Sequence, residues 1–571
     1  MFSVEKLLGE FYPENALEIE RLISNYHRAK GSSDYLRSAE LIKAYVGLGD
    51  IIFYPMGTIY ETWKEPIGFN IIKGHLKIVS PIEKYILKDA KLEPIKVVFL
   101  SGNSVGVKRL KVIDVGDGED ETNYPQDIEG QAILAMGDLT KVFHNAKRHG
   151  ASCVLLYYMR AQDPVVQRTP ELLPNAVNYV SFPYYANGEL FGFSLSYSQY
   201  RELAKLAKDG LEIEAELEVD KGTNALQVLE GTIGSSDESL PPILLTAHLC
   251  HPKPGANDNA SGSALLAEMM KVLSKFDLKR KVVALWVPEM YGTIPYIIDH
   301  KPDFYCGINL DMVGENQDIT HSTLGVETTP WSLPSFIAEL VAVNLETSRF
   351  RMQQGYYTGG SDHYIFDDST VQVPFASLTQ WPDRFYHSSE DTVDKSHVAS
   401  FSWIGEAILK TIYELNFGMP EETFRKVKAL LISNYMRDIK NVPLVDNWLS
   451  YRLYKSFELL SEFGNTKSEM QFLSSKFDKA KFPQRKNVKN FLGPLGDAWE
   501  KETDEDWQRQ ITRRIPSFGD FLYELLNFLE VGYSVEDATI IAKAEFGIED
   551  DLVSEVDYYI RRLKDQGLIN L

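Results

Sequence analysis

The sequence predicts an α/β protein, a three-layer sandwich around a mainly parallel sheet, with two further units attached. Between about residues 226 and 420, runs that are apolar throughout, such as PPILLTAHL and KRKVVALWVPEM, alternate with helical stretches such as SGSALLAEMMKVLSKF. Strands buried on both faces and separated by helices are typical of a parallel sheet covered on both sides. A chain of 571 residues is also too long for one core.

The first ninety residues are predicted to belong to this α/β unit. Val4 to Arg28 and Tyr35 to Val46 have the periodicity of amphipathic helices, and strands such as GHLKIVS follow them. We therefore assign residues 1–93 and 226–425 to one domain.

Residues 94–225 form a predicted small β-rich insertion. Its run AILAMG, the helical stretch LTKVFHNAKRHGA and the run SCVLLYY have the order of one βαβ unit. Short β-like runs such as VVFLSG and LKVIDVG precede it. The insertion is therefore expected to fold on its own sheet.

Residues 430–571 are predicted to be helical. The last part, from FGDFLYELLNFLEVG onward, has the pattern of three helices with tight turns, close to a winged helix. Residues Ser534 to Leu571 include nine acidic and four basic residues. The resulting net charge of −5 disfavours binding to phosphate groups.

Composition excludes some partners. The 81 acidic residues against 59 basic ones give a net charge of −22, which argues against nucleic acid or an anionic membrane as a partner. Cys153, Cys250 and Cys306 fit neither a disulfide framework nor a cysteine-rich zinc module. The acidic N-terminus lacks the features of a signal peptide. A cytoplasmic location is expected.

The segment LLTAHLCHPKPGANDNASG carries the first candidate ligands. A buried strand leads into His248 and His251, and Asp258 precedes a helix. Imidazole and carboxylate groups at a strand end suit zinc. The alternative is a polar loop with Asp258 as an ordinary helix N-cap, and for either histidine taken alone a structural role is favoured.

Three more residues also follow apolar runs, and together with Asp258 they favour a metal site over a helix cap. Glu289, Asp311 and His387 each follow an apolar run that ends at the carboxyl edge of the sheet. With Asp258 and one histidine they make five ligands, about the number that a two-metal site needs, with one carboxylate bridging ions roughly 3.5–4 Å apart.

The segments HLCHPKPGANDNASG, PEMYGT, NLDMVGE, GGSDHYIF and YHSSEDT occur in this order. They resemble the zinc aminopeptidase family that includes leucine-type aminopeptidases and glutamate carboxypeptidase. The match is to an aminopeptidase-like bacterial branch with a C-terminal winged-helix-like domain, and residues 94–225 are similar to its protease-associated insertion. The resemblance implies the zinc-peptidase fold and two zinc ions per chain.

Carried over, the resemblance implies that Asp258 bridges the metals. Glu289 and His387 would serve one ion, and a histidine with Asp311 the other. In the wider family the ligand histidine is followed two places later by Asp, and His248 fits this position except that Cys250 replaces the Asp. The narrower branch has Cys-His-Pro, which favours His251.

The general base is left open. The wider family has two consecutive glutamates, a base and a ligand, where this chain has Pro288 and Glu289. Glu289 is then either the base or a ligand. In the second case the metals alone, or a group such as Glu315 or Glu390, would activate water.

Other residues are expected near the metals. By resemblance, Asp362 and His363 of GGSDHYIF bind substrate beside them, although Asp362 is equally well explained as a turn cap. In the loop QWPDRFYH, Trp381 and Phe385 either wall a substrate pocket or belong to the core.

The function expected is that of a zinc aminopeptidase acting on a peptide or aminoacyl substrate. Two alternatives stay open: a metal-dependent amidohydrolase acting on acyl-amino small molecules, and a non-catalytic binding protein with a peptidase fold. The sequence sets no oligomeric state, so a homo-oligomer is one option.

Overall fold

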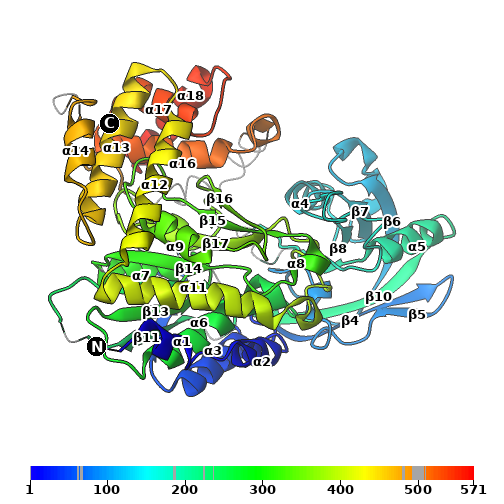
Figure 1. The fold of residues 1–571 in the computed structure, drawn as a ribbon. Helices are drawn as coiled ribbons and strands as arrows, with labels where there is room; N and C mark the ends of the chain where they lie inside the picture. The colour runs from blue at the N-terminus through cyan, green and yellow to red at the C-terminus, as the bar shows by residue number, and fades with distance from the viewer. Residues whose placement is uncertain are drawn as a thin grey trace.

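Eight strands form the central sheet of the computed structural model, in the order β1-β11-β13-β12-β14-β17-β15-β16 (Figure 1). The neighbours β13, β12, β14 and β17 pair in parallel, whereas β1/β11, β11/β13 and β15/β17 are antiparallel pairs. The predicted parallel sheet is therefore confirmed at its centre, with antiparallel strands toward its edges. The strands are β1 (Asp50–Pro55), β11 (Ala225–Ile233), β12 (Ile243–His248), β13 (Val282–Val287), β14 (Cys306–Leu310), β15 (Thr323–Glu327), β16 (Met352–Gly355) and β17 (Phe375–Trp381).

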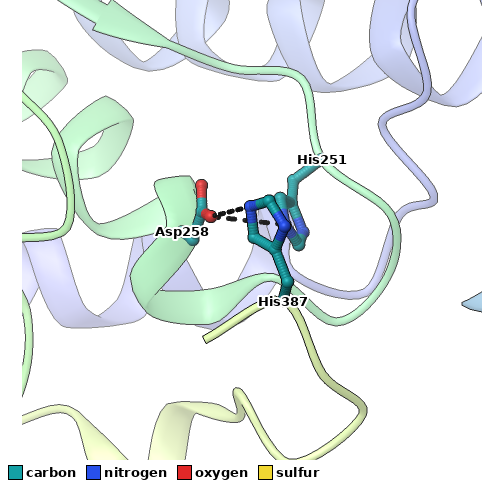
Figure 2. Close-up of side chains that lie close together, drawn as sticks. All are labelled: His251, Asp258 and His387. Atoms are coloured by element: carbon teal, nitrogen blue, oxygen red, sulfur yellow. Dashed lines mark ion pairs between the residues drawn. The ribbon is translucent and has the colours of Figure 1, made fainter. Parts of the chain in front are cut away.

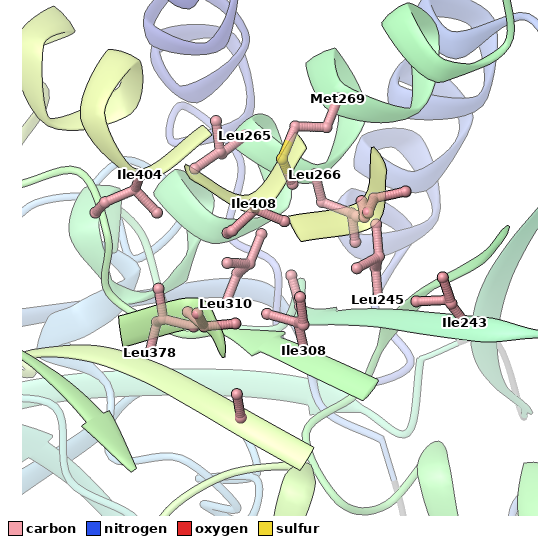
Figure 3. Packing of buried hydrophobic residues seen from close by; sticks show 14 of the residues in the cluster. Ile243, Leu245, Leu265, Leu266, Met269, Ile308, Leu310, Leu378, Ile404 and Ile408 are labelled. Atoms are coloured by element: carbon pink, nitrogen blue, oxygen red, sulfur yellow. The ribbon is translucent and has the colours of Figure 1, made fainter. Parts of the chain in front are cut away.

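The central strands carry apolar side chains on both faces of the sheet, and helices cover both faces. Ile243 and Leu245 pack into one core cluster, whereas Leu244 packs into another on the opposite face. Figure 3 shows the first cluster between the sheet and its covering helices. Helices α2 (Pro13–Ile23), α3 (Ser33–Val46), α6 (Gly262–Leu273), α9 (Ile337–Leu345) and α11 (Val398–Phe417) supply the first layer, and α7 (Thr293–His300) and α10 (His363–Phe366) the second.

The structure describes residues 2–60, 63–64, 68–183, 188, 190–222, 225–235, 237–301, 303–478, 482–490, 507 and 510–571. The first predicted helix divides into α1 (Val4–Leu8) and α2, with Gly9 capping the first and Pro13 opening the second. No described helix is long and apolar enough to cross a membrane.

A second sheet has seven strands in the order β5-β4-β10-β6-β7-β8-β9 and stands to one side of the first (Figure 1). The predicted βαβ unit is present as β7 (Ala132–Met136), α4 (Leu139–Arg148) and β8 (Cys153–Tyr157), and its strands are parallel. The other elements are β4 (Asn70–Ser80), β5 (Lys84–Leu87), β6 (Lys108–Asp117), β9 (Phe191–Ser194), α5 (Tyr197–Ala207) and β10 (Glu212–Asp220).

The boundary of this inserted unit differs from the prediction. Residues 70–87, which we expected in the α/β domain, form β4 and β5 of the second sheet, where β4 pairs with β10. The unit therefore begins near residue 70 rather than at residue 94. Pairing with a strand some 140 residues away leaves no local signal in the sequence.

The C-terminal part is helical, as predicted, from α12 (Glu421–Asp438), α13 (Pro443–Leu460) and α14 (Lys467–Ser474) onward. The three expected last helices are α16 (Phe518–Val531), α17 (Val535–Glu545) and α18 (Val553–Asp565). They share a core with α13 and with Trp331 of the α/β domain. Among the described residues of this part, strand pairing is limited to the bridge between Lys489 and Ile569.

Candidate metal centre

The predicted ligands meet where the parallel strands end. His248 is the last residue of β12, Asp311 follows β14 directly, and Glu289 comes two residues after β13. The loop after β17 carries His387. Because β13, β12, β14 and β17 run in the same direction, their carboxyl ends form one edge of the sheet.

Asp258 lies at the centre of the group. Its Oδ2 is 3.0 Å from Nε2 of His387 and 3.4 Å from Nε2 of His251, and these are the side chains in Figure 2. Its Oδ1 is 3.2 Å from Nε2 of His248, which is 3.3 Å from Oδ1 of Asp311. Two clusters suited to a metal ion result, His251–Asp258–His387 and His248–Asp258–Asp311, and they share Asp258.

Both histidines of the HLCH segment therefore reach Asp258. His248, at the end of its strand, lies beside Asp311, whereas His251 lies beside His387, with ring centres 5.2 Å apart. The expectation of a single ligand histidine, His251 paired with Asp311, is wrong. Both histidines lie beside Asp258, and the neighbour of Asp311 is His248.

Hydrogen bonds orient both imidazoles. Nδ1 of His248 lies 3.0 Å from the carbonyl of Cys250, and Nδ1 of His251 lies 2.8 Å from the carbonyl of Pro252. A carbonyl only accepts, so each Nδ1 carries a proton, and the Nε2 atom of each ring is the one that faces Asp258. Nε2 of His251 is buried without a hydrogen-bond partner among the described residues, as expected of an atom that binds a metal ion.

The backbone around Asp258 is fixed by neighbouring segments. Asp391 of the YHSSEDT motif accepts hydrogen bonds from the amides of Asn257 (2.8 Å) and Asp258 (3.1 Å). Asn259 accepts from the amide of Met312 (3.1 Å) and donates to the carbonyl of Leu310 (2.8 Å). These contacts set the orientation of Asp258 relative to the end of β14.

The loop before Asp258 depends on a buried arginine and a glycine. Arg28 donates to the carbonyls of Leu249 (2.9 Å) and Gly255 (2.6 Å), and its own carbonyl accepts from the amide of His251 (3.0 Å). Gly255 has φ +49°, and a Cβ there would lie 2.2 Å from Nδ1 of His251. The loop therefore requires glycine at this position.

The pKa values of the ligands reflect burial and their mutual contacts. Burial opposes ionisation of Asp258, but the adjacent imidazoles outweigh it and hold the pKa well below its usual range. Burial, with the charges of His387 and Arg28, lowers the pKa of His251 to about 3, so this imidazole is neutral at pH 7.

His248 has the opposite shift. Burial opposes its positive charge, yet the carboxylates of Asp311, Glu289 and Asp258 raise its pKa well above the usual value. Positive charge is thus favoured at this point, and a metal ion would supply it in place of the proton. The donor set of neutral imidazoles and carboxylates fits zinc.

Glu289 lies beside the clusters but belongs to neither. Burial, with the negative charges of Asp311 and Asp258, raises the pKa of this carboxyl to about 7 against the effect of His248. Its amide donates to Sγ of Cys250 (3.2 Å). A carboxyl with a pKa near neutrality beside a metal centre is suited to moving a proton.

The two alternative bases lie elsewhere. Neither Glu315 nor Glu390 is among the described residues that border the cavity next to the clusters. Glu315 is buried against Asp383, and both burial and that carboxyl raise its pKa well above the usual range. Of the three candidate bases, Glu289 alone borders the cavity.

Asp362 and His363 have different positions. Asp362 is fully buried and does not border the cavity; it accepts hydrogen bonds from the amide of Met290 (2.8 Å) and the hydroxyl of Thr293. The prediction that Asp362 contacts substrate is corrected: it fixes the turn after Glu289. His363 borders the cavity, and its Nε2 is 3.4 Å from a carboxylate oxygen of Glu327.

His363 is charged at neutral pH. Burial opposes the charge, but the hydrogen bond and negative charge of Glu327 raise the pKa of this imidazole to about 9. Sequence reasoning did not single out Glu327, because it stands in an ordinary strand, TLGVE, without a motif.

The cavity next to the clusters has a volume of about 700 Å³. The inserted unit lines one side of it with Phe99, Arg160 and Tyr179. The amide of Tyr179 donates to the carbonyl of His387 (2.7 Å), so the unit is attached to the loop that carries a ligand. Trp381 borders the cavity, whereas Phe385 is buried in a small core cluster. Of the two aromatic residues, Trp381 therefore lines the pocket and Phe385 belongs to the core.

Sequence comparison gives relatives with named activities. The chain is 25% identical over 348 residues to Aminopeptidase YwaD of Bacillus subtilis (strain 168), covering 56% of this chain and 70% of that protein. It is 26% identical over 212 residues to a putative polysaccharide biosynthesis protein with aminopeptidase-like domain of Clostridium acetobutylicum. That alignment covers 36% of this chain and 45% of the relative, so the chain spans less than half of that relative's length.

Solved structures share the fold. BSAP, a zinc aminopeptidase from Bacillus subtilis, aligns with a TM-score of 0.53 at 20% identity over 71% of this chain and 95% of its own. A putative peptidase from Clostridium acetobutylicum aligns with a TM-score of 0.54 at 18% identity, over 83% of this chain and 96% of its own. The profile of Peptidase family M28 matches residues 229–412, which contain both clusters. Residues 229–412, about a third of the chain, are therefore similar to peptidase family M28.

Proposed function

We propose that the chain is a zinc-dependent aminopeptidase with two ions per chain. The observation that carries the proposal is the pair of clusters that share Asp258, each with imidazole and carboxylate ligands. Relatives named as aminopeptidases, YwaD and BSAP, support the reaction class.

Six side-chain atoms would hold the ions. Nε2 of His251, Oδ2 of Asp258 and Nε2 of His387 would take one, and Nε2 of His248 with Oδ1 of Asp258 and of Asp311 the other. When bound, zinc polarises a substrate carbonyl and makes a water molecule acidic.

Glu289 would then move the protons. As a carboxylate it accepts a proton from the attacking water, and as a carboxylic acid it returns that proton to the leaving amine. A pKa near the working pH allows both steps. This role makes Glu289 the base, and Pro288 then occupies the place of the wider family's first glutamate without removing the function.

The proposal extends to the other units. The inserted unit, similar to a protease-associated domain, would act as a lid because Tyr179 borders the cavity and is bonded to the His387 loop. The three cysteines are all free, which suits a cytoplasmic location. Recovery of the native protein outside the cytoplasm on cell fractionation would contradict this location. The winged-helix assignment and the absence of nucleic-acid binding stay predictions; a gel-shift assay checks the latter.

Elemental analysis combined with an amide panel tests the function. Two zinc ions per chain and cleavage of aminoacyl 4-nitroanilides, abolished by chelation, are expected. Cleavage of N-acylated amides alone would favour the amidohydrolase instead. Two bound ions without turnover of any substrate would favour a binding protein.

A further inference from the structure

The part of the cavity beyond the metal clusters has a floor made by three strands, β16, β15 and β17. Along β15, Thr323, Gly325 and Glu327 border the cavity, while Leu324 and Val326 between them point into the core. The strand alternation therefore presents one polar face to the cavity.

Strand register arranges this face in rows. Thr379 and Gln353 stand opposite Gly325 on its two sides, and Ser377 and Gly355 stand opposite Glu327. All of them border the cavity. We call this set the polar floor: Thr323, Gly325, Glu327, Gln353, Gly355, Ser377 and Thr379.

The glycines of this region are not required by the fold. Gly325, Gly355 and Gly360 all border the cavity, and none has a positive φ. A Cβ at Gly355 or Gly360 would meet nothing within 4 Å, and one at Gly325 would make an ordinary contact of 3.5 Å with Thr379. Glycine weakens a strand interior, and often marks a place where a ligand approaches closely.

The polar side chains of the floor have hydrogen-bonding capacity to spare. Within the part of the chain that the structure describes, no hydrogen bond is made by the side chains of Thr323, Thr379 or Gln353. Ser377 accepts one from the Asn309 amide (3.2 Å). Hydroxyl and amide groups both donate and accept, so they match a ligand that does the same at several points.

The charge of the polar floor and the aromatic side chains beside it indicate which class of ligand fits the cavity. The negative charge of Glu327 is offset by the neighbouring His363, whose Nε2 lies 3.4 Å from a carboxylate oxygen of Glu327. Trp381, 41% exposed, packs edge-on against Tyr386 (5.0 Å between ring centres), which in turn stacks on His387 (3.8 Å). An exposed aromatic face beside hydroxyl and amide groups suits a sugar ring, whose C–H face packs on aromatics while its hydroxyls form hydrogen bonds.

We propose that the polar floor binds a sugar ring, and that the substrate is an aminoacyl or peptidyl compound that carries a sugar. The substrate class rests on the proposed aminopeptidase function, whereas the sugar site does not. A plain peptide would be held through a strand edge and alternating side-chain pockets, whereas the floor offers an open polar face.

Binding to the zinc-loaded protein tests the site without any turnover. Ligand-observed NMR titrations would use N-acetylglucosamine, glucose, galactose and mannose, with N-acetylcyclohexylamine as a ring without hydroxyls. At least one sugar should bind at least tenfold more tightly than the cyclohexyl compound. Gly325→Val and, on another strand, Gly355→Val should each weaken that binding at least tenfold by filling the floor.

Gly234→Val is the matched control, because Gly234 is an exposed glycine outside the cavity whose Cβ would also meet nothing within 4 Å. It should bind sugar as the parent does. No preference for any sugar over the cyclohexyl ring, or equal binding by the floor variants and the parent, overturns the proposal, as does tighter binding of an N-acetyl dipeptide amide than of every sugar.

Turnover separates this inference from the proposed function. Leucyl-glucosamine should be cleaved with at least tenfold higher kcat/KM than leucyl-cyclohexylamine. Sugar binding without cleavage of any aminoacyl amide would contradict the aminopeptidase proposal and support the sugar site. Cleavage of both amides at equal rates, without sugar binding, would support the aminopeptidase proposal and contradict the sugar site.

Discussion

Asp258 directs its two carboxylate oxygens at different imidazoles, Oδ2 at His251 and His387 and Oδ1 at His248. A carboxylate held this way can bridge two cations. The bonds from the backbone of residues 257 and 258 to Asp391 keep it in place. Each histidine thus belongs to one cluster, and removing it should affect one ion.

We therefore expect His248→Ala and His251→Ala each to lower the zinc content from two ions per chain to about one. The cluster that keeps all three ligands should hold its ion. Elemental analysis after dialysis measures this, with His300→Ala, a histidine outside both clusters, as the control. A variant that keeps both ions would show that its histidine is not a ligand.

Glu289→Gln should lower kcat by about 10²–10⁴-fold and leave the zinc content unchanged, because the amide cannot take a proton. In the parent, kcat/KM should rise with pH through the range where Glu289 loses its proton, at or below its pKa of about 7, since bound cations favour the carboxylate. The variant should lack this rise. Loss of an ion from Glu289→Gln would instead make Glu289 a ligand.

The loop between β12 and α6 supplies His251 and Asp258 to the metal centre. Its ends are set by the strand and the helix, and its middle by Arg28 and Asp391. The start of α6 also lies close to β14: a Cβ at Gly262 would be 2.3 Å from the carbonyl of Leu310. The loop tolerates little change in shape.

Gly255→Ala should therefore reduce zinc content, because its methyl group would displace His251. Gly47→Ala is the matched control: Gly47 also has a positive φ, +80°, but a Cβ there would meet nothing within 4 Å. The control should lose roughly 1–2 kcal/mol of stability from backbone strain and keep its zinc. Equal zinc in both variants, measured by elemental analysis, would contradict the role of Gly255.

The inserted unit and the α/β domain both line the cavity. Arg168 of the inserted unit is buried, and it donates to the carbonyl of Arg384 in the α/β domain (3.1 Å) and to Oδ1 of Asn178 (3.1 Å). Through these bonds it holds the segment that carries Tyr179 against the loop that carries His387.

Arg168→Ala should lower kcat/KM for an aminoacyl 4-nitroanilide at least tenfold, because the lid loses its attachment to the active-site loop. Arg109→Ala, which breaks an exposed ion pair with Glu212 in the same unit, should change it less than twofold. Steady-state kinetics of both variants would refute the lid role if their effects were equal.

The sequence predicts those site residues whose position depends on the order of strands and loops along the chain. Asp311 and His248 are predictable as site residues because each ends an apolar run, and the carboxyl ends of parallel strands lie along one edge of the sheet. Membership of β4 in the second sheet and the inward turn of Asp362 were not predictable, since both depend on partners distant in the chain. The sequence leaves His251 and His248 as alternatives, because spacing alone does not show that a loop brings both side chains to one carboxylate.

Anomalous X-ray scattering at the zinc edge from crystals of the parent protein tests the two-ion centre most directly. We expect two peaks per chain, roughly 3.5–4 Å apart, one on each side of Asp258, and neither peak in Asp258→Ala. A single peak, or two peaks that persist in Asp258→Ala, would contradict a carboxylate shared by two ions.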